Sequence, residues 1–178
     1  MKKPILIVAA LLAISLFSNK VMAQAAAPAA ATGDVVSTLT ASGDYTAFSV
    51  ALRAAGVSDA AEAAGPFTVF AVSNDVLSKT PSTRLDSLVK DPTKLAAVLK
   101  FHVLAGKYSK ADIIKALTGT KDHKTTLKTI DGKDLTLSIV GGKLQIADDH
   151  GNTALVAVYD IPATNGVIHG VTAILAGK

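Results

Sequence analysis

Histidines are the residues of this chain best suited to acid–base chemistry, and two of the four stand inside apolar runs. His102 lies in the segment FHVLAG, and His169 lies in the segment NGVIHGV. A hydrolase could combine His102 with Ser73 and Asp75, because a catalytic triad needs a nucleophile, a base and an orienting carboxylate. No GxSxG turn surrounds Ser73, however, and capping of a helix N-terminus explains both Ser73 and Asp75. The residues therefore favour a protein that is not an enzyme.

Metal binding is a sharper chemical alternative, since Asp148, Asp149 and His150 are adjacent oxygen and nitrogen donors. A second donor pair, Asp122 and His123, occurs in another loop. Zinc and calcium need several ligands that converge on one point, and adjacent residues of an extended loop usually point apart. We therefore expect surface polar groups at these positions, and no metal or other cofactor.

The element that would position Ser73 and Asp75 is the segment GPFTVFAVSND, which begins at Gly65. Gly-Pro is a turn signal, and the β-branched and aromatic run 67–72 that follows it suits a buried strand. Ser73, Asn74 and Asp75 then offer acceptors for the free N–H groups of a short helix. This arrangement is typical of a scaffold and not of a reaction centre.

Helix signals dominate the first half of the chain, and strand signals dominate the second half. Capping residues and helical spacing predict helices over these segments: 35–41 after Asp34, 45–55, a segment opened by a Thr83/Asp86 capping box, 92–101 after Asp91, and a segment from a Ser109/Asp112 capping box to Gly119. Alternating apolar residues predict strands at 127–130, 135–139, 144–146, 153–159 and 167–175. Asp131-Gly132 and Gly141-Gly142 are strong hairpin turns between strands. Helices and strands segregated in this way indicate an α+β fold.

Three segments together resemble the signature of the fasciclin-like domain family: the GPFTVFA strand with its helix start, FHVLAG, and NGVIHGV. The resemblance covers residues 33–178 and implies an α+β fold, a β-wedge of two sheets with helices packed on one side. It implies a structural role for the residues of the motif: Phe67, Val69, Phe70, Asn74, Asp75, Asn165, Gly166 and His169. Two departures occur, because Phe101 replaces the usual Tyr and Val72-Ser73 stands where Pro-Thr is common.

Two roles are open for His102. One is structural, a buried imidazole whose ring nitrogens are satisfied by backbone or by a carboxylate, and the resemblance adds Asn74 or Asp75 as its partner. The other is functional, because the resemblance implies that this pair contacts a partner: the Tyr-His pair of some animal members is implicated in integrin-dependent adhesion. Phe101 lacks the Tyr hydroxyl, so any contact that needs that hydroxyl is lost. Phe101 and His102 are thus candidate partner-binding residues.

The first 23 residues are typical of a secretory signal peptide, with Lys2 and Lys3 before an apolar core. That core is too short to span a bilayer comfortably, so we expect no transmembrane segment after cleavage near Ala23-Gln24. Residues 24–32 predict an Ala-rich flexible linker, and residues 33–178 predict one domain. The chain has no Cys, so an exported domain must be held together by its core. We expect the protein to be secreted or periplasmic.

Charge is unevenly distributed along the chain. The whole sequence has 18 Lys and Arg against 14 Asp and Glu, but loss of Lys2, Lys3 and Lys20 with the signal leaves a net charge of +1. This balance removes the compositional support for nucleic-acid binding. Positive charge gathers in the middle of the chain, at Lys107, Lys110, Lys115, Lys121, Lys124 and Lys128. These lysines form either a solvated face or a footprint for acidic polysaccharide, anionic lipid headgroups or an acidic protein.

The observations together predict a secreted, non-enzymatic interaction module. The resemblance implies that this module acts in adhesion to a cell surface, a matrix or a biofilm. The expected partner is a protein or an acidic polysaccharide, bound by surface loops and lysines, and we expect a monomer. An alternative is an envelope protein that binds a small ligand or a polysaccharide in a cleft between the sheet and the helices. A third hypothesis is an enzyme or metal protein that uses the His and Asp loops.

Overall fold

The computed structural model describes residues 31–59 and 65–175, so the predicted signal peptide and most of the predicted linker lie outside the described residues. The helices are Val35–Ala41 (α1), Thr46–Ala54 (α2), Asn74–Lys79 (α4), Ser82–Val89 (α5), Pro92–Phe101 (α6) and Lys110–Thr118 (α7). The strands are Phe67–Val72 (β1), Val103–Ala105 (β2), Lys124–Lys128 (β3), Asp134–Val140 (β4), Lys143–Ala147 (β5), Thr153–Ala163 (β6) and Gly166–Val171 (β7). None of the described helices has the length and apolar character needed to cross a bilayer.

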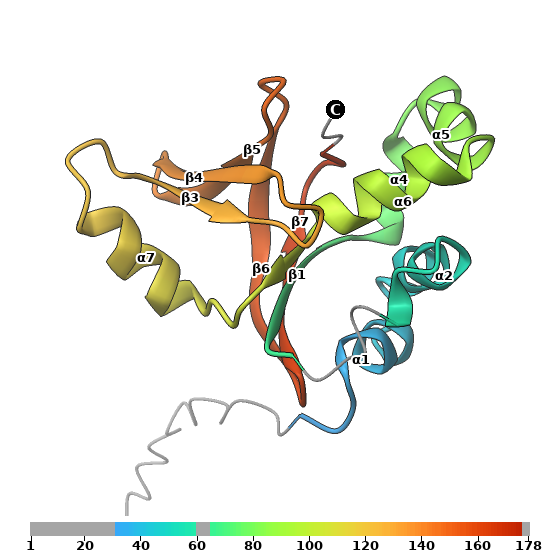
Figure 1. The fold of residues 1–178 in the computed structure, drawn as a ribbon, viewed down its shortest axis with the longest axis horizontal. Helices are drawn as coiled ribbons and strands as arrows, with labels where there is room; N and C mark the ends of the chain where they lie inside the picture. The colour runs from blue at the N-terminus through green and yellow to red at the C-terminus, as the bar shows by residue number, and fades with distance from the viewer. Residues whose placement is uncertain (1–30, 60–64, 176–178) are drawn as a thin grey trace, which may run out of the picture.

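The strands form one hydrogen-bonded sheet in the order β2-β1-β7-β6-β5-β4-β3 (Figure 1). β1 and β7 run parallel, in a register that places Phe67 opposite Gly166 and Phe70 opposite His169. The other neighbouring pairs are antiparallel. Two signature segments that are far apart in the sequence are therefore adjacent strands inside the sheet, away from its edges.

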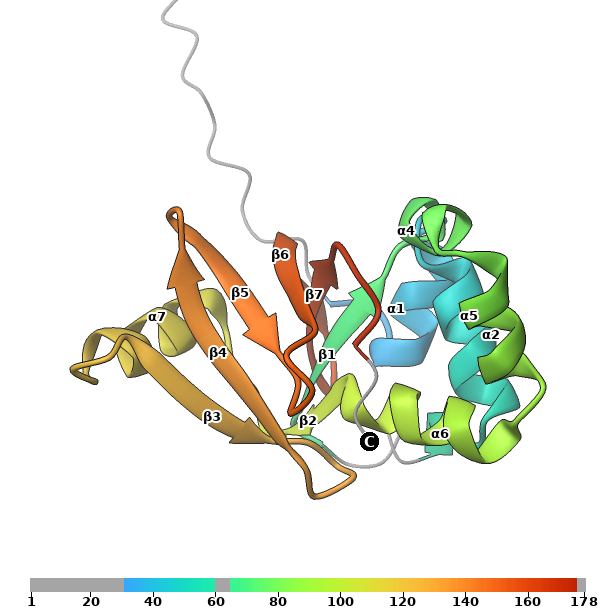
Figure 2. The ribbon, with the colours of Figure 1, turned by 90° about the horizontal axis from the view of Figure 1, so that it is seen from above.

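β6 joins the two halves of the sheet and explains the wedge. Its first residues pair with β5, and its later residues pair with β7 from Val156 to Ala163. The register with β7 shifts on both sides of Val158, and Asp160 has a φ of 57°. Bulges of this kind bend a strand and increase its twist, so β3, β4 and β5 stand at an angle to β1 and β7 (Figures 1 and 2). The predicted α+β fold is confirmed, and the two sheets of the predicted β-wedge are the two angled halves of one continuous sheet.

The helices lie in two places. α1, α2, α4, α5 and α6 gather beside β1 and β7, whereas α7 lies apart, next to β3 and β4 (Figures 1 and 2). The predicted capping box opens α7, because the Ser109 side chain accepts the N–H of Asp112 and the Asp112 side chain accepts the N–H of Ser109. Ile113 and Leu117 are the buried residues of α7. The expectation of helices on one side thus holds for the described helices other than α7.

Several boundaries differ from the sequence-based predictions. β3 spans Lys124–Lys128 instead of 127–130, and β7 ends at Val171 instead of Leu175. α5 begins directly after Pro81, and no side chain caps it, so the predicted Thr83/Asp86 capping box does not form. The carbonyl of Pro81 accepts two N–H groups of the helix instead. β6 continues to Ala163, past the predicted end at Tyr159, because the strand keeps pairing with β7 beyond its bulges.

The core draws on both halves of the chain. β1 is buried from its second residue to its last, because it lies between β2 and β7 and the helices cover it. A strand buried on both faces needs a near-continuous apolar run rather than an alternating one, and the run after Phe67 meets this need. Phe70, Leu52, Phe101 and Ile168 are among the side chains with no exposed area.

Candidate functional site

Asn74, the first residue of α4, connects two helices. Its Oδ1 accepts the N–H of Ala47 at 3.0 Å. Its Nδ2 donates to the Gly43 carbonyl at 2.9 Å and to Thr46 Oγ1 at 3.0 Å. Tyr45, at the N-cap position of α2, makes no side-chain capping bond. Asn74 of α4 therefore supplies α2 with the acceptor that an N-cap residue normally provides.

We expect Asn74→Ala to lower the free energy of unfolding by about 1–2 kcal/mol, because α2 loses its capping acceptor. Urea unfolding followed by circular dichroism measures this change. Ser78→Ala is the matched control in the same helix, because the Ser78 hydroxyl bonds only within exposed α4, to the Asp75 carbonyl at 2.8 Å. The capping role is contradicted if Asn74→Ala costs no more than this control.

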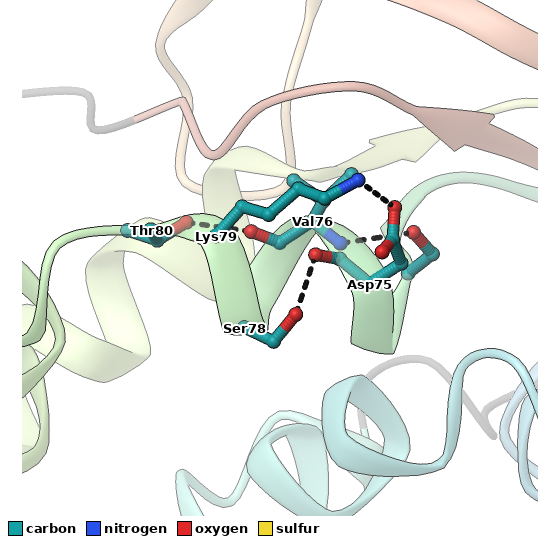
Figure 3. A network of polar contacts seen from close by, with 6 residues as sticks. Asp75, Val76, Ser78, Lys79 and Thr80 are labelled. Carbon is teal, nitrogen blue, oxygen red and sulfur yellow. Dashed lines mark hydrogen bonds and ion pairs between the residues drawn. The ribbon is translucent and has the colours of Figure 1, made fainter.

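Asp75 forms an ion pair within α4. Its Oδ2 lies 2.8 Å from Lys79 Nζ, and the two side chains are 69% and 73% exposed. Figure 3 shows this pair beside the hydroxyl-to-carbonyl bonds of Ser78 and Thr80. The Asp75 carboxylate therefore faces solvent, and exposed pairs of this kind contribute little to stability.

His102, at the C-cap of α6, is buried. Its Nδ1 donates to the Val98 carbonyl at 2.8 Å, and its Nε2 accepts the N–H of Leu175 at 3.3 Å. Burial lowers the pKa of His102 to about 4, although the hydrogen bond to Val98 opposes this shift. This is the backbone-satisfied imidazole of the structural alternative. The expected partnership of His102 with Asn74 or Asp75 is wrong, because backbone groups occupy both ring nitrogens.

His169, in β7, is satisfied in a similar way with the opposite tautomer. Its Nε2 donates to the Tyr108 carbonyl at 2.9 Å, and its Nδ1 accepts the N–H of Asp160 at 3.2 Å. Burial lowers the pKa of His169, and its ring packs against Phe70 with the centroids 5.6 Å apart. His169 therefore ties the segment before α7 and the bulged part of β6 to the centre of the sheet.

The turn before β7 fastens α1 and β1 together. Asn165 Oδ1 accepts the N–H of Val35, the first residue of α1, at 2.9 Å. The Asn165 carbonyl accepts the N–H of Phe67 at 2.9 Å. A Cβ at Gly166 would collide with the Phe67 carbonyl oxygen, so the close approach of β1 and β7 needs glycine.

Phe101 and His102 are not surface residues. Their exposed fractions are 0% and 1%, and the His102 ring meets Phe48 edge-on with the centroids 5.8 Å apart. A partner cannot touch side chains that have no exposed area. The expectation that Phe101 and His102 contact a partner directly is therefore wrong for this conformation.

Ser73, His102 and Asp75 do not assemble into a triad. Ser73 Oγ accepts the N–H of Val76 at 3.4 Å, as the N-cap of α4. Asp75 pairs with Lys79, and both nitrogens of His102 bond to backbone. No one of the three side chains is placed to activate another, since a nucleophile and its base must lie within hydrogen-bond reach.

The acidic loop between β5 and β6 is built around Asp148. Its carboxylate accepts the N–H groups of His150 and Asn152 at 2.9 and 2.8 Å, and Nδ2 of Asn152 at 2.7 Å. Asp148 is buried, which corrects the expectation of a surface group. Asp122 and His123 lie in an exposed turn between α7 and β3. In the described parts of the chain, no three His, Cys, Asp or Glu residues come together as a possible metal site.

Six lysines in the middle of the chain are exposed and are here called the lysine surface: Lys107, Lys110, Lys115, Lys121, Lys124 and Lys128. They lie before, on and after α7, and on β3 (Figure 1). Lys110 Nζ lies 4.5 Å from the centre of the Tyr159 ring. Lys128 Nζ pairs with Asp134 at 2.8 Å. The sequence placed these lysines around one helix, and the structure adds β3 to the same region.

An apolar cavity of about 280 Å³ lies among the helices. Side chains of α2, α4, α5 and α6 and of the segment after β7 form most of its wall, chiefly Ala51, Leu77, Leu85, Leu88, Leu95 and Ile174. The cleft expected between the sheet and the helices is thus a cavity within the group of helices. Sequence reasoning missed it, because the spacing of leucines on α5 and α6 predicts an apolar face but not how completely that face is packed.

These features define a class of protein: an α+β scaffold in which the signature residues bond strands to helices and the lysine surface lies outside. The family model of the Fasciclin domain matches residues 43–176. The chain belongs to this family.

Relatives of known sequence and structure fit this assignment. Protein sll1483 of Synechocystis sp. is 31% identical over 153 residues, which cover 85% of this chain and 76% of that protein. Transforming growth factor-beta-induced protein ig-h3 of Sus scrofa is 29% identical over 125 residues, which cover 70% of this chain but 16% of that protein. A FAS1 domain pair from the insect cell adhesion molecule fasciclin I has the same fold, with a TM-score of 0.65 and 18% identity, over 82% of this chain and 51% of that chain. The domain therefore occurs in a cell adhesion molecule.

Proposed function

We propose that the protein is a secreted or periplasmic, non-enzymatic adhesion module that meets an acidic polysaccharide or an acidic protein through its lysine surface. Family membership supports adhesion, since the domain occurs in a cell adhesion molecule. The signal peptide predicted for residues 1–23 supports export. The backbone bonding of His102 and His169 supports a role without acid–base chemistry. The proposal includes the expectation that the protein acts as a monomer.

The observation that carries the proposal is the exposure of the lysine surface on and around α7 and β3. Hydrogen bonds from Ser109 lower the pKa of Asp112, and the neighbouring charges of Lys115 and Lys107 lower it further. Clustered charge raises the encounter rate with an oppositely charged partner. Exposed ammonium groups bind anions as separate point charges, so the association should be weak and should fall as salt rises.

Replacement of Lys121, Lys124 and Lys128 by Glu tests the proposal. Binding of the purified domain to immobilised heparin, a sulfated polysaccharide, is measured by surface plasmon resonance at low and high salt. We expect the triple variant to bind at least about tenfold more weakly than the wild type at low salt, because three attractive charges become repulsive. We expect wild-type binding to disappear at high salt.

Replacement of Lys79, Lys90 and Lys94 by Glu is the matched control, because it makes the same change in net charge on the other group of helices. This variant should keep most of the wild-type affinity. Equal losses in the two variants would assign binding to net charge rather than to the lysine surface. Unchanged binding in the first variant, or binding that survives high salt, would overturn the proposal.

A further inference from the structure

We propose that the cavity among α2, α4, α5 and α6 binds one small amphiphile, with a medium-length acyl chain inside the cavity and an anionic head beside it. The helices that line the cavity lie apart from α7, which carries part of the lysine surface (Figures 1 and 2). The inference therefore adds an interior site to the surface function proposed above, and does not rest on it.

The volume of the cavity sets the size of the occupant. It measures about 280 Å³, nearly twice the roughly 150 Å³ of a dry protein cavity that accepts one benzene molecule. Because benzene has six carbon atoms, a cavity of nearly twice that volume holds a chain of on the order of ten carbon atoms. A helix of a partner protein, with a diameter of about 10 Å including side chains, is too wide to enter.

The lining of the cavity sets the chemistry of the part inside. His102 is the one lining residue with a titratable side chain, and backbone groups use both of its ring nitrogens. A polar group in the cavity would therefore lose its water without gaining a hydrogen bond from the walls. Water itself needs two or more polar partners to stay in such a space. A hydrocarbon chain has neither requirement.

α5 forms a loosely packed wall of the cavity. None of its residues is fully buried, no side chain caps its N-terminus, and Val89 at its end is 70% exposed although it lines the cavity. Leu85 and Leu88, on the same helix, also line the cavity and are only half-buried. An acyl chain would give these side chains the apolar contacts that the protein alone does not provide, since close packing is the norm in protein interiors.

The charge next to the cavity favours an anionic head. Ile174 belongs to the cavity wall and also to a neighbouring groove that contains Lys79 and Arg84. Arg84 Nη2 donates to the Ile174 carbonyl at 3.3 Å, which places this guanidinium at the shared wall. Asp75 lies in the same groove and already pairs with Lys79, so a carboxylate there would meet the Arg84 guanidinium while its chain lies in the cavity.

Fluorescence of N-phenyl-1-naphthylamine tests the site, because this neutral dye brightens when it leaves water for an apolar pocket. We expect the wild-type domain to bind the dye and decanoate to displace it. Ala51→Phe places a ring in the cavity and should weaken dye binding at least about tenfold. Ala54→Phe is the matched control on the same helix, because Ala54 is exposed and is absent from the cavity wall. It should bind as the wild type does.

A second variant distinguishes a filled cavity from a misfolded protein. Ala47→Leu fills the cavity from the preceding turn of α2 with a smaller side chain, and circular dichroism confirms that each variant is folded. Dye binding that is absent in the wild type, or unchanged in Ala51→Phe and Ala47→Leu, would overturn the site. Decanol that competes as well as decanoate would overturn the anionic head. Heparin binding should stay unchanged in both variants, so failure of this inference is distinguishable from failure of the adhesion proposal.

Discussion

Phe70→Ala should lower the free energy of unfolding by about 3–5 kcal/mol, the largest loss expected from a single truncation in this domain. Phe70 is 0% exposed and lies in the middle of β1, between β2 and β7. Its ring packs against His169, whose own bonds hold β6 and the segment before α7. The variant loses the free energy gained by burying the ring. It also leaves a cavity that the hydrogen-bonded strands on both sides cannot close.

Urea unfolding of the purified domain measures this loss. Phe67→Ala is the control within the same strand, because Phe67 is only half-buried and its truncation leaves part of the site open to solvent. It should cost clearly less than Phe70→Ala. A loss below about 1 kcal/mol for Phe70→Ala would show that the ring does not contribute to the core.

Stability should fall as the pH drops from about 6.5 towards 4, and His102 should account for about 3 kcal/mol of that fall. Burial lowers the pKa of His102 to about 4 in the folded protein, from a usual value of 6.5. The unfolded chain therefore binds more protons than the folded protein between these two values, which favours unfolding as pH falls. Protonation would also turn Nε2 into a donor, facing the N–H of Leu175. His169, whose pKa is also lowered by burial, adds to the same trend.

Unfolding curves at several pH values between 4 and 7 measure this dependence. His102→Gln should be less stable than the wild type at pH 7 and should show a shallower pH dependence, because Gln does not titrate in this range. His123→Gln is the control, since His123 is exposed in a turn, and it should follow the wild-type curve. A His102→Gln profile parallel to that of the wild type would contradict the assignment.

Most helix caps were predictable from the sequence, although the Thr83/Asp86 capping box predicted in the same way does not form. Asp34 caps α1, Asp91 caps α6, and the Ser109/Asp112 capping box opens α7, as predicted. In each case a side-chain oxygen and the N–H group that it accepts lie within a few residues, so the sequence holds both partners.

Contacts between distant segments were not predictable in the same way. The partners of His102 include Leu175, which is 73 positions away, and no spacing rule connects the two. The expectation of Asn74 or Asp75 as partner failed because Asn74 caps α2 instead. The burial of Phe101 follows from where the apolar stripe of α6 meets the core, which depends on elements on both sides of it. The cavity was missed for the same reason, since its volume depends on how closely four helices and the segment after β7 pack against one another.

The bond between the Val35 N–H and Asn165 Oδ1 joins positions 130 residues apart, and β1 needs β7 as its parallel neighbour. Contacts of such long range form slowly and late, because most of the chain must be present before they can close. During synthesis, α1 and β1 could not form these contacts until nearly the whole polypeptide had been made. A precursor of this kind would remain loose while it leaves the ribosome, and would become compact only once its final strand had arrived.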